Sequence, residues 1–290
     1  MIEQIGIVGA GTMGNGIAQV CAAAGLPVVM TDISDAALTR GMSVVANSLE
    51  RLVNKQKMTD ADRQAALARI TTSTDTTKFS TCDLVIEAAT ENEDLKIKIL
   101  KDLCTKLPPR ALLATNTSSI SITKLAAATD RPDRFIGLHF FNPVPLMALL
   151  ELIRGLQTSD DTHAKAEAFS KRIGKVSITA KNSPGFAVNR ILCPMINEAI
   201  FALQEGIATA EDLDAGMKLG CNHPMGPLEL ADFVGLDVCL AVMEVMQAGL
   251  GDSKYRPAPL LRKYVEAGWL GRKSGKGFYD YASNPPKPTR

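Results

Sequence analysis

The fold of the N-terminal half is decided by Ile5-Gly6-Ile7-Val8-Gly9-Ala10-Gly11-Thr12-Met13-Gly14. Its first four residues predict a short strand, and residues 15–24 have a helical pattern that ends at a glycine. Between them, the first glycine permits a tight turn, the second a close approach of a pyrophosphate, and the third close helix packing. A pyrophosphate would lie at the positive end of the helix. The stretch therefore predicts a dinucleotide site formed by Gly9, Gly11, Thr12, Met13 and Gly14.

An acidic residue after the next predicted strand indicates which dinucleotide is bound. Residues 27–31 predict that strand, and Asp32 follows it, eighteen residues after Gly14. A carboxylate here can accept hydrogen bonds from the adenosine ribose and would repel a 2′-phosphate, so NAD is predicted rather than NADP. The alternative is a glycine turn beside an unrelated surface aspartate. The complete strand, loop, helix, strand and acid arrangement favours the NAD site.

Composition limits the classes of partner. The 290 residues suit two domains, and 32 basic against 31 acidic side chains give a net charge of +1. We therefore expect no nucleic-acid or membrane partner, and any anionic ligand must be held by a local site. Six cysteines without a C-x-x-C pair and only three histidines indicate reduced thiols and no metal site. With no long apolar segment and a strand at the N-terminus, the chain is expected to be cytoplasmic and to lack a signal peptide.

Residues 35–70 form a polar segment of helical pattern between the second and third predicted strands. Long insertions of this kind often carry specificity. Ser48, Lys55 and Lys57 could meet a phosphorylated ligand there. The alternative is that these lysines are simply solvated, which is the more common role of lysines on a polar helix.

Polar residues stand at the ends of several predicted strands. Glu91 follows the strand over residues 82–89, and Asn116 and Ser118 follow the strand over 111–115. Ligands of open parallel sheets bind outside the carboxyl ends of the strands, so these residues are expected around one crevice, together with His139. Residues 117–119 could instead cap the helix predicted over 122–128. The two roles are compatible, because one hydroxyl can cap while another faces a ligand.

A histidine and a glutamate twelve residues apart are the candidate acid and base. His139 lies in Leu138-His139-Phe140-Phe141-Asn142-Pro143, and Glu151 interrupts the apolar run 149–153. A carboxylate in an apolar segment needs a partner. An imidazole is a suitable one, because the carboxylate fixes its tautomer and supports its use as a base. The alternative is a core histidine beside an unrelated glutamate.

A break at residues 182–186 separates a second region, in which strand signals stop. Helices are predicted over 188–204, 211–218, 228–233 and 238–248, all rich in apolar residues. So much apolar surface in a small helical unit suggests packing against a second copy of the chain. The predicted class is thus α/β, with a Rossmann-type dinucleotide-binding domain followed by an all-α C-terminal domain.

Several motifs in the same order give the chain a resemblance to a known family, the L-3-hydroxyacyl-CoA dehydrogenases, especially the short bacterial 3-hydroxybutyryl-CoA dehydrogenase type. The matching segments run nearly from end to end and comprise residues 7–14, 116–119, 139–143 with Glu151, 183–186 with 189–190, 223–228 and 274–279. The resemblance implies an NAD-binding domain over 1–183, with a helical insertion near 35–70. It also implies a helical domain over 184–290 for dimerisation, with the active site in the cleft between the two.

The resemblance also implies roles for particular residues. His139 resembles the catalytic base, Glu151 the carboxylate paired with it, and Ser118 and Asn189 the residues that hold the substrate oxygens. Positions similar to NAD contacts are Asp32, Glu91, Lys96, Asn116, Asn142 and Lys276, and Ser48, Lys55 and Ser118 resemble residues that meet the CoA substrate. The implied enzyme is a homodimeric NAD-dependent oxidoreductase of fatty acid and butanoate metabolism that interconverts (S)-3-hydroxyacyl-CoA and 3-oxoacyl-CoA.

Two other functions are considered. A dehydrogenase that acts on a free hydroxy acid would not need Ser48 and Lys55. A structural protein that kept the fold would not need His139 and Glu151, so their presence with Ser118 and Asn189 speaks against this reading.

Overall fold

The computed structural model describes residues 2–289, and the chain divides into two units between Ser183 and Pro184. Met1–Ser183 form the N-terminal unit and Pro184–Arg290 the C-terminal unit.

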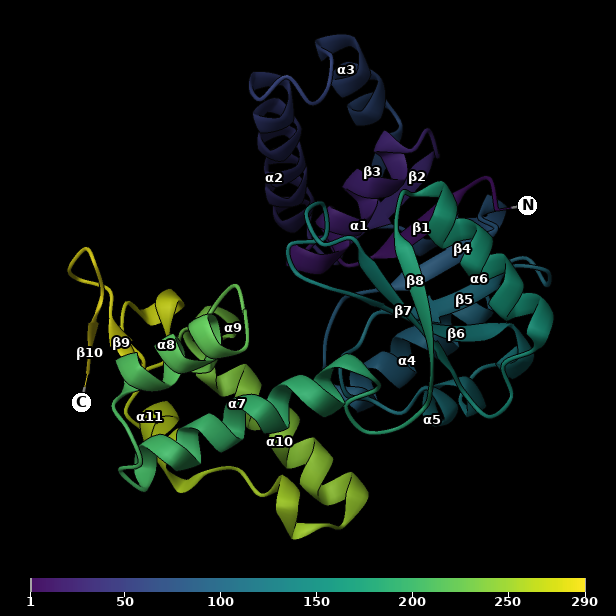
Figure 1. Cartoon of the computed structure of the whole chain (residues 1–290). Helices are drawn as coiled ribbons and strands as arrows, with labels where there is room; N and C mark the ends of the chain where they lie inside the picture. The colour runs from purple at the N-terminus through teal and green to yellow at the C-terminus, as the bar shows by residue number, and fades with distance from the viewer. Residues whose placement is uncertain (1, 290) are drawn as a thin grey trace. The chain divides into compact units, whose positions relative to one another are not determined.

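One sheet of eight strands organises the N-terminal unit, in the order β3-β2-β1-β4-β5-β6-β7-β8 (Figure 1). The neighbouring strands from β3 to β6 are parallel, β7 is antiparallel to β6, and β8 is parallel to β7. The order reverses between β1 and β4, which is where open α/β sheets bind their ligands. The strand bounds are Ile5–Val8 (β1), Val28–Thr31 (β2), Ile70–Ser73 (β3), Leu84–Glu87 (β4), Leu112–Thr115 (β5), Phe135–Phe140 (β6), Leu149–Arg154 (β7) and Val176–Lys181 (β8).

The central strands are buried along their whole length, as expected for a parallel sheet with both faces covered. Hydroxyl and amide side chains fix where several of the helices begin, because Ser34, Asn92 and Ser159 each accept a hydrogen bond from the first turn that follows. The α-helices are Thr12–Ala23 (α1), Asp35–Asn54 (α2), Asp60–Ala68 (α3), Glu93–Cys104 (α4), Ile122–Ala127 (α5) and Asp160–Arg172 (α6), with 3-10 turns at Thr76–Thr81 (η1) and Pro132–Arg134 (η2).

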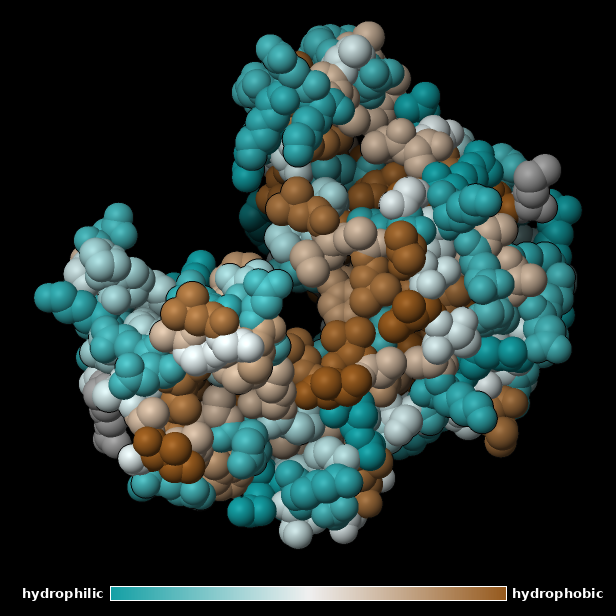
Figure 2. Space-filling view, viewed as in Figure 1, coloured by the Kyte–Doolittle hydropathy of each residue, from teal (hydrophilic) through white to brown (hydrophobic). Residues whose placement is uncertain are grey.

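Helices α2 and α3 form the predicted insertion and project beyond the edge of the sheet (Figure 1). Their surface is mostly hydrophilic (Figure 2). The insertion ends one residue earlier than predicted, because Ile70 begins β3, which pairs with β2 in parallel. The sequence analysis missed β3, since three of its four residues are polar and lie at least partly exposed.

The C-terminal unit is helical, as predicted, and its main core cluster contains buried residues of each α-helix given below. It also contains a pair of two-residue antiparallel strands that the sequence analysis did not predict. Its elements are α7 (Val188–Gln204), α8 (Ala210–Gly220), α9 (Pro227–Val234), α10 (Leu236–Leu250), η3 (Ser253–Tyr255), α11 (Pro259–Glu266), η4 (Arg272–Ser274), β9 (Tyr279–Asp280) and β10 (Lys287–Pro288).

Within residues 2–289, no single helix has the length and hydropathy needed to cross a membrane. The pair α9 and α10 meets that measure only when taken together, and it bends by 96° at the break between the two helices.

Candidate active site

The glycine turn after β1 is shaped by backbone contacts of two of its glycines. Gly9 has a φ of 102°, and a Cβ atom there would lie 2.7 Å from the Ala89 Cα. A Cβ on Gly14 would lie 1.8 Å from the Gly9 carbonyl oxygen. A side chain on Gly9 would therefore collide with the loop after β4, and one on Gly14 would push α1 away from the end of β1.

Gly11 differs, because no protein atom lies within 4 Å of the place where its Cβ would be. Packing within the chain does not require a glycine here. Gly11 is also the N-cap of α1, and the first turn contains no acidic residue and no side-chain cap. A ligand can come close to the positive end of α1 because Gly11 has no side chain. This suits a dinucleotide pyrophosphate, which the backbone N–H groups of Thr12 and Met13 in the first turn could bind.

Asp32 directly follows β2 and is tied to the glycine turn. Its Oδ2 accepts a hydrogen bond of 2.8 Å from the Ala10 backbone N–H. The carboxylate is therefore held beside the turn at the carboxyl ends of β1 and β2, which are neighbours in the sheet. This is the place where an acid can bind a ribose hydroxyl of NAD.

Glu91 connects the loop after β4 to the loop after β5. Its Oε2 accepts a 2.8 Å hydrogen bond from the Thr117 hydroxyl, and its Oε1 accepts hydrogen bonds from the Ser118 N–H at 2.9 Å and the Ser118 hydroxyl at 3.2 Å. The structure therefore brings Glu91 and Ser118 together, as predicted from the strand ends. The cap of α5 is Ser121, and not one of residues 117–119.

Lys96 lies deeper than the sequence analysis assumed. Its side chain is completely buried, and Nζ donates hydrogen bonds to Glu87 Oε2 at 2.5 Å, Thr115 Oγ1 at 3.2 Å and the Asn116 carbonyl at 3.1 Å. This enclosed position differs from the predicted direct contact with NAD. It favours a role in which the ammonium group holds the backbone of Asn116.

Glu87, the partner of Lys96, was missed by the sequence analysis. It is the last residue of β4, is fully buried, and also accepts hydrogen bonds from the Ala89 N–H and the Thr115 hydroxyl. A carboxylate at the end of an otherwise apolar strand is the signal that could have identified it, because such a group needs a buried partner.

Asn116 links this network to the strand that carries the histidine. Its Oδ1 accepts a 3.0 Å hydrogen bond from the Phe140 N–H, at the end of β6. The residue before Phe140 is His139, so the end of β5 and the histidine are held in fixed relation.

His139 and Glu151 are in contact. They are directly paired residues of the antiparallel strands β6 and β7, and His139 Nδ1 lies 2.5 Å from Glu151 Oε2. Glu151 is fully buried and His139 is 6% exposed. A proton on Nδ1 would be donated to the carboxylate across this contact, and such a hydrogen bond would fix the tautomer of the ring.

The residues after His139 begin the loop that joins β6 to β7. The Phe141 ring lies 4.5 Å from the His139 ring, measured between centroids. Asn142 is exposed and is joined to Pro143 by a cis peptide bond. The loop therefore starts with an aromatic neighbour of the histidine and an accessible amide side chain.

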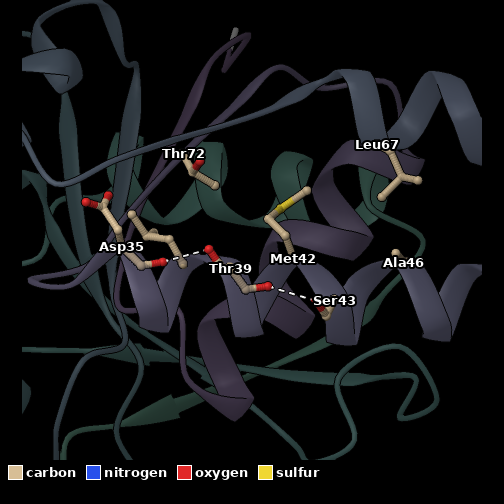
Figure 3. A pocket seen from close by; sticks show the side chains of 8 residues that line it. Asp35, Thr39, Met42, Ser43, Ala46, Leu67 and Thr72 are labelled. Carbon is tan, nitrogen blue, oxygen red and sulfur yellow. Dashed lines mark hydrogen bonds between the residues drawn. The ribbon is translucent and has the colours of Figure 1, made fainter.

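Ser48 lies on α2 and Lys55 is its C-cap, seven residues and about two turns further, so they are on one side of that helix. The structure also has a wide pocket of about 520 Å³ at α2, lined by Thr39, Met42 and Ala46 among others, with Leu67 of α3 and Thr72 of β3 (Figure 3). The α2 residues that line it are about half a turn away from Ser48 and Lys55. The pocket therefore lies on the other side of the helix and is not the place predicted for CoA.

Two predicted site residues belong to the C-terminal unit. Asn189 is the second residue of α7 and is half-buried, and the guanidinium group of its neighbour Arg190 lies 4.6 Å from the Tyr255 ring centroid. Lys276 Nζ lies 4.3 Å from the Trp269 ring centroid and 4.0 Å from Asp280 Oδ2. Their roles toward substrate and NAD stay predictions.

Comparisons with known proteins agree with this architecture. Residues 4–183 match the family model described as 3-hydroxyacyl-CoA dehydrogenase, NAD binding domain, and residues 185–281 match 3-hydroxyacyl-CoA dehydrogenase, C-terminal domain. A 3-hydroxybutyryl-CoA dehydrogenase of Bradyrhizobium diazoefficiens is 56% identical over 290 residues, which is 100% of this chain and 99% of that protein.

Solved structures give the same picture. The (S)-3-hydroxybutyryl-CoA dehydrogenase PaaH1 from Ralstonia eutropha is 64% identical with a TM-score of 0.95, over 98% of this chain and 100% of that one. FadB2 of Mycobacterium tuberculosis is 45% identical, also with a TM-score of 0.95, over 97% of this chain and 99% of that one. With both of its units matched, the chain belongs to the 3-hydroxyacyl-CoA dehydrogenase family and is an NAD-dependent oxidoreductase.

Proposed function

We propose that this protein is a 3-hydroxybutyryl-CoA dehydrogenase that interconverts (S)-3-hydroxyacyl-CoA and 3-oxoacyl-CoA, with His139 and Glu151 as its general acid and base. The observation that carries the proposal is the 2.5 Å contact between His139 Nδ1 and the buried Glu151 Oε2. The relatives named above, which are 56% and 64% identical, support the choice of substrate.

The proposed mechanism follows from the tautomer of the histidine. In oxidation, Nε2 of His139 removes the proton of the C3 hydroxyl, and Glu151 stabilises the imidazolium through Nδ1. In reduction, the imidazolium returns that proton to the developing alkoxide. NAD supplies the hydride acceptor, and NADH the donor. The Ser118 hydroxyl, which donates its one proton to Glu91 in this structure, would turn from Glu91 to donate it to the substrate oxygen.

The CoA part of the substrate is proposed to lie along the face of α2 that carries Ser48 and Lys55. Lys55 is the C-cap of α2, and its side chain is exposed to solvent. A cation there can attract a phosphate of CoA, and the attraction should weaken as salt is added. Asn189 would hold a substrate oxygen, as the resemblance implies.

The test is the loss of NADH absorbance on mixing the protein with NADH and acetoacetyl-CoA. NADPH in place of NADH and acetoacetate in place of the thioester are the parallel reactions. We expect rapid loss only with NADH and the thioester. Loss with acetoacetate alone would replace the proposal with a dehydrogenase independent of CoA, and no loss in any mixture would contradict an enzymatic role for the pair.

The CoA contact has a separate test with a matched control. Lys55→Ala should raise the KM for acetoacetyl-CoA about tenfold or less with little change in kcat, because a contact far from the reacting atoms contributes to substrate and transition state alike. Lys165→Ala, which removes an exposed lysine of α6, is the control. An unchanged KM in Lys55→Ala would exclude that lysine from the CoA site.

A further inference from the structure

The loop between β6 and β7, residues 141–148, closes the hairpin that holds His139 opposite Glu151. It carries Asn142 and has its own turn, in which the Leu146 and Met147 N–H groups donate to the Pro143 carbonyl. The position of this loop therefore affects both ends of the His139–Glu151 pair.

A buried lysine from outside the hairpin is bonded to this loop. Lys175 follows α6 and is 9% exposed, and its Nζ donates hydrogen bonds of 2.6 Å to the Val144 carbonyl and of 2.6 Å to the Met147 carbonyl. Both partners are main-chain carbonyls and neither is a carboxylate. Burial lowers the pKa of the Lys175 ammonium group below its usual range.

The backbone at Lys175 is also held in place by hydrogen bonds. Gly174 has a φ of 71° and ends α6, and the Lys175 N–H donates to the Ser170 carbonyl at 2.9 Å. One residue later, β8 begins, and the Val176 N–H donates to the Ala148 carbonyl at the end of the same loop. The lysine thus reaches the loop from a rigid junction between a helix and a strand.

The opposite side of the loop packs on α1, the helix of the dinucleotide motif. Val144 is 2% exposed, and a Cβ on Gly16 would lie 2.9 Å from the Val144 Cβ. Burial raises the pKa of the Cys21 thiol of α1, a neighbour of Lys175, so far that the thiol is uncharged at neutral pH. The loop is therefore held between α1 and the Lys175 ammonium group.

We propose that Lys175 is a positioning residue for the dehydrogenase reaction, whose ammonium group locks loop 141–148 and so fixes the His139–Glu151 pair and Asn142. The inference rests on the proposed function of that pair. No apolar residue can replace the ammonium group, because the buried Val144 carbonyl and the part-buried Met147 carbonyl would both lose their donor.

The test compares Lys175→Met with Lys175→Arg and Lys171→Met. Methionine keeps the length of the side chain without its donors, arginine restores donors, and Lys171 is an exposed lysine of α6. Three quantities are measured in the full-length protein: kcat with acetoacetyl-CoA, the Kd for NADH, and the imidazole 15N chemical shifts of His139, which report the tautomer. The chain has only three histidines, so His139→Gln assigns the signals.

We expect Lys175→Met to lower kcat about 10- to 100-fold, as a displaced catalytic group does, with a clearly smaller loss of affinity for NADH, because Asn142 is the residue of the loop that is assigned to NAD. The His139 signals should then show a second tautomer. Lys175→Arg should recover most of the kcat, and Lys171→Met should match the unchanged protein. If Lys175→Met does not fold, Lys175→Gln, with a neutral NH2 donor, is measured in the same way with the same expected pattern at smaller size.

Unchanged kcat and tautomer in a folded variant of lower melting temperature would overturn the proposal and leave Lys175 a purely structural residue. An equal loss of kcat and NADH affinity would overturn it too, since that pattern indicates general damage. The tautomer measurement needs no turnover, so it tests the role of Lys175 even if the unchanged protein fails to consume NADH with acetoacetyl-CoA. That last result would contradict the proposed function alone.

Discussion

Lys96 and Glu87 form an ion pair in which both side chains are completely buried, with Nζ 2.5 Å from Oε2. Four further hydrogen bonds, to or from Thr115, Asn116 and Ala89, surround it. When every polar atom of a buried ion pair has a hydrogen-bond partner, the pair can hold the segments that it joins in a single arrangement. Here these are the ends of β4 and β5 and the start of α4, beside the predicted NAD site.

Removing one partner of this ion pair should strongly destabilise the folded protein. We expect Lys96→Met to lower the free energy of unfolding by about 3 to 5 kcal/mol, because it leaves the Glu87 carboxylate buried without its cation. Urea unfolding measures the loss. Glu87→Gln combined with Lys96→Met should be less destabilised than Lys96→Met alone. As a control, Glu93→Gln removes the exposed partner of Lys124 and should change stability by less than about 1 kcal/mol. Equal effects at the two sites would contradict the argument from burial.

Replacing the histidine should lower kcat strongly and change the affinity for NADH little. His139→Gln is expected to lower kcat about 10²- to 10⁴-fold, the usual contribution of a positioned general base, while NADH binding followed by its fluorescence stays close to that of the unchanged protein. Glu151→Gln should lower kcat in the same direction, because the amide can no longer stabilise the imidazolium. His163→Gln, which alters an exposed contact with Thr179, is the control. Normal turnover in His139→Gln would rule out its role as the base.

Asp32 should set the preference for NAD over NADP. Asp32→Asn keeps an oxygen that can accept from the Ala10 N–H but removes the charge that would repel a 2′-phosphate. We expect the ratio of kcat/KM for NADPH to that for NADH to rise about tenfold or more, since one charge interaction of this kind is worth about 1.4 kcal/mol or more. Asp35→Asn, an exposed change in the first turn of α2, serves for comparison. A ratio that moves equally in both variants would remove Asp32 from cofactor selection.

The cysteines should differ sharply in reactivity. Cys221 is exposed, whereas burial raises the pKa of the Cys82 and Cys193 thiols to about 12. Since the thiolate is the reactive form, a thiol reagent at neutral pH should modify Cys221 first in the folded protein, and the buried thiols only after unfolding. Mass spectrometry of digested protein locates the label, and Cys221→Ser should abolish the fast phase. Fast labelling of Cys193 in folded protein would show that its surroundings open readily.

The homodimer is also a prediction. The C-terminal unit exposes apolar side chains on three helices, Ile191 at 73% on α7, Phe233 at 50% on α9 and Val238 at 42% on α10, and brown patches mark its surface in Figure 2. Such surface favours self-association. Light scattering should give twice the 31.0 kDa chain mass for the unchanged protein and a lower mass for Ile191→Asp. Leu156→Asp, which changes a more exposed residue of the N-terminal unit, should keep the dimer mass. A monomeric unchanged protein would refute the prediction.

Much of the fold could be read from local sequence patterns. The helix predicted over 188–204 has those bounds in the structure, because a long apolar periodicity leaves little choice. The contact between His139 and Glu151 is present because a carboxylate in an apolar strand needs a buried partner, and a histidine stood within reach. These predictions were correct because one short segment of sequence contains both the hydrophobic pattern and the residues that satisfy it.

The elements and buried residues that were not predicted have a different cause in common. Strand β3 contains Thr71, Thr72 and Ser73, and it forms because β2 offers it an edge, which no local pattern reveals. Helix α11 begins at a proline and is only 8 residues long, which is too short for a clear helical period. Lys96 and Lys175 look like ordinary surface lysines in sequence, because their burial depends on residues brought together only by the folded sheet.

The pairing of His139 with Glu151 depends on strand register and not on the length of loop 141–148. Strand β7 is also bonded to β8 along its whole length, so its register is fixed from both sides. A slip of one residue would turn Glu151 to the other face of the sheet and bring a leucine opposite the histidine. Strand register therefore decides which residue of β7 stands opposite the histidine, whereas loop 141–148, bonded to Lys175, bears on how closely the two side chains are held.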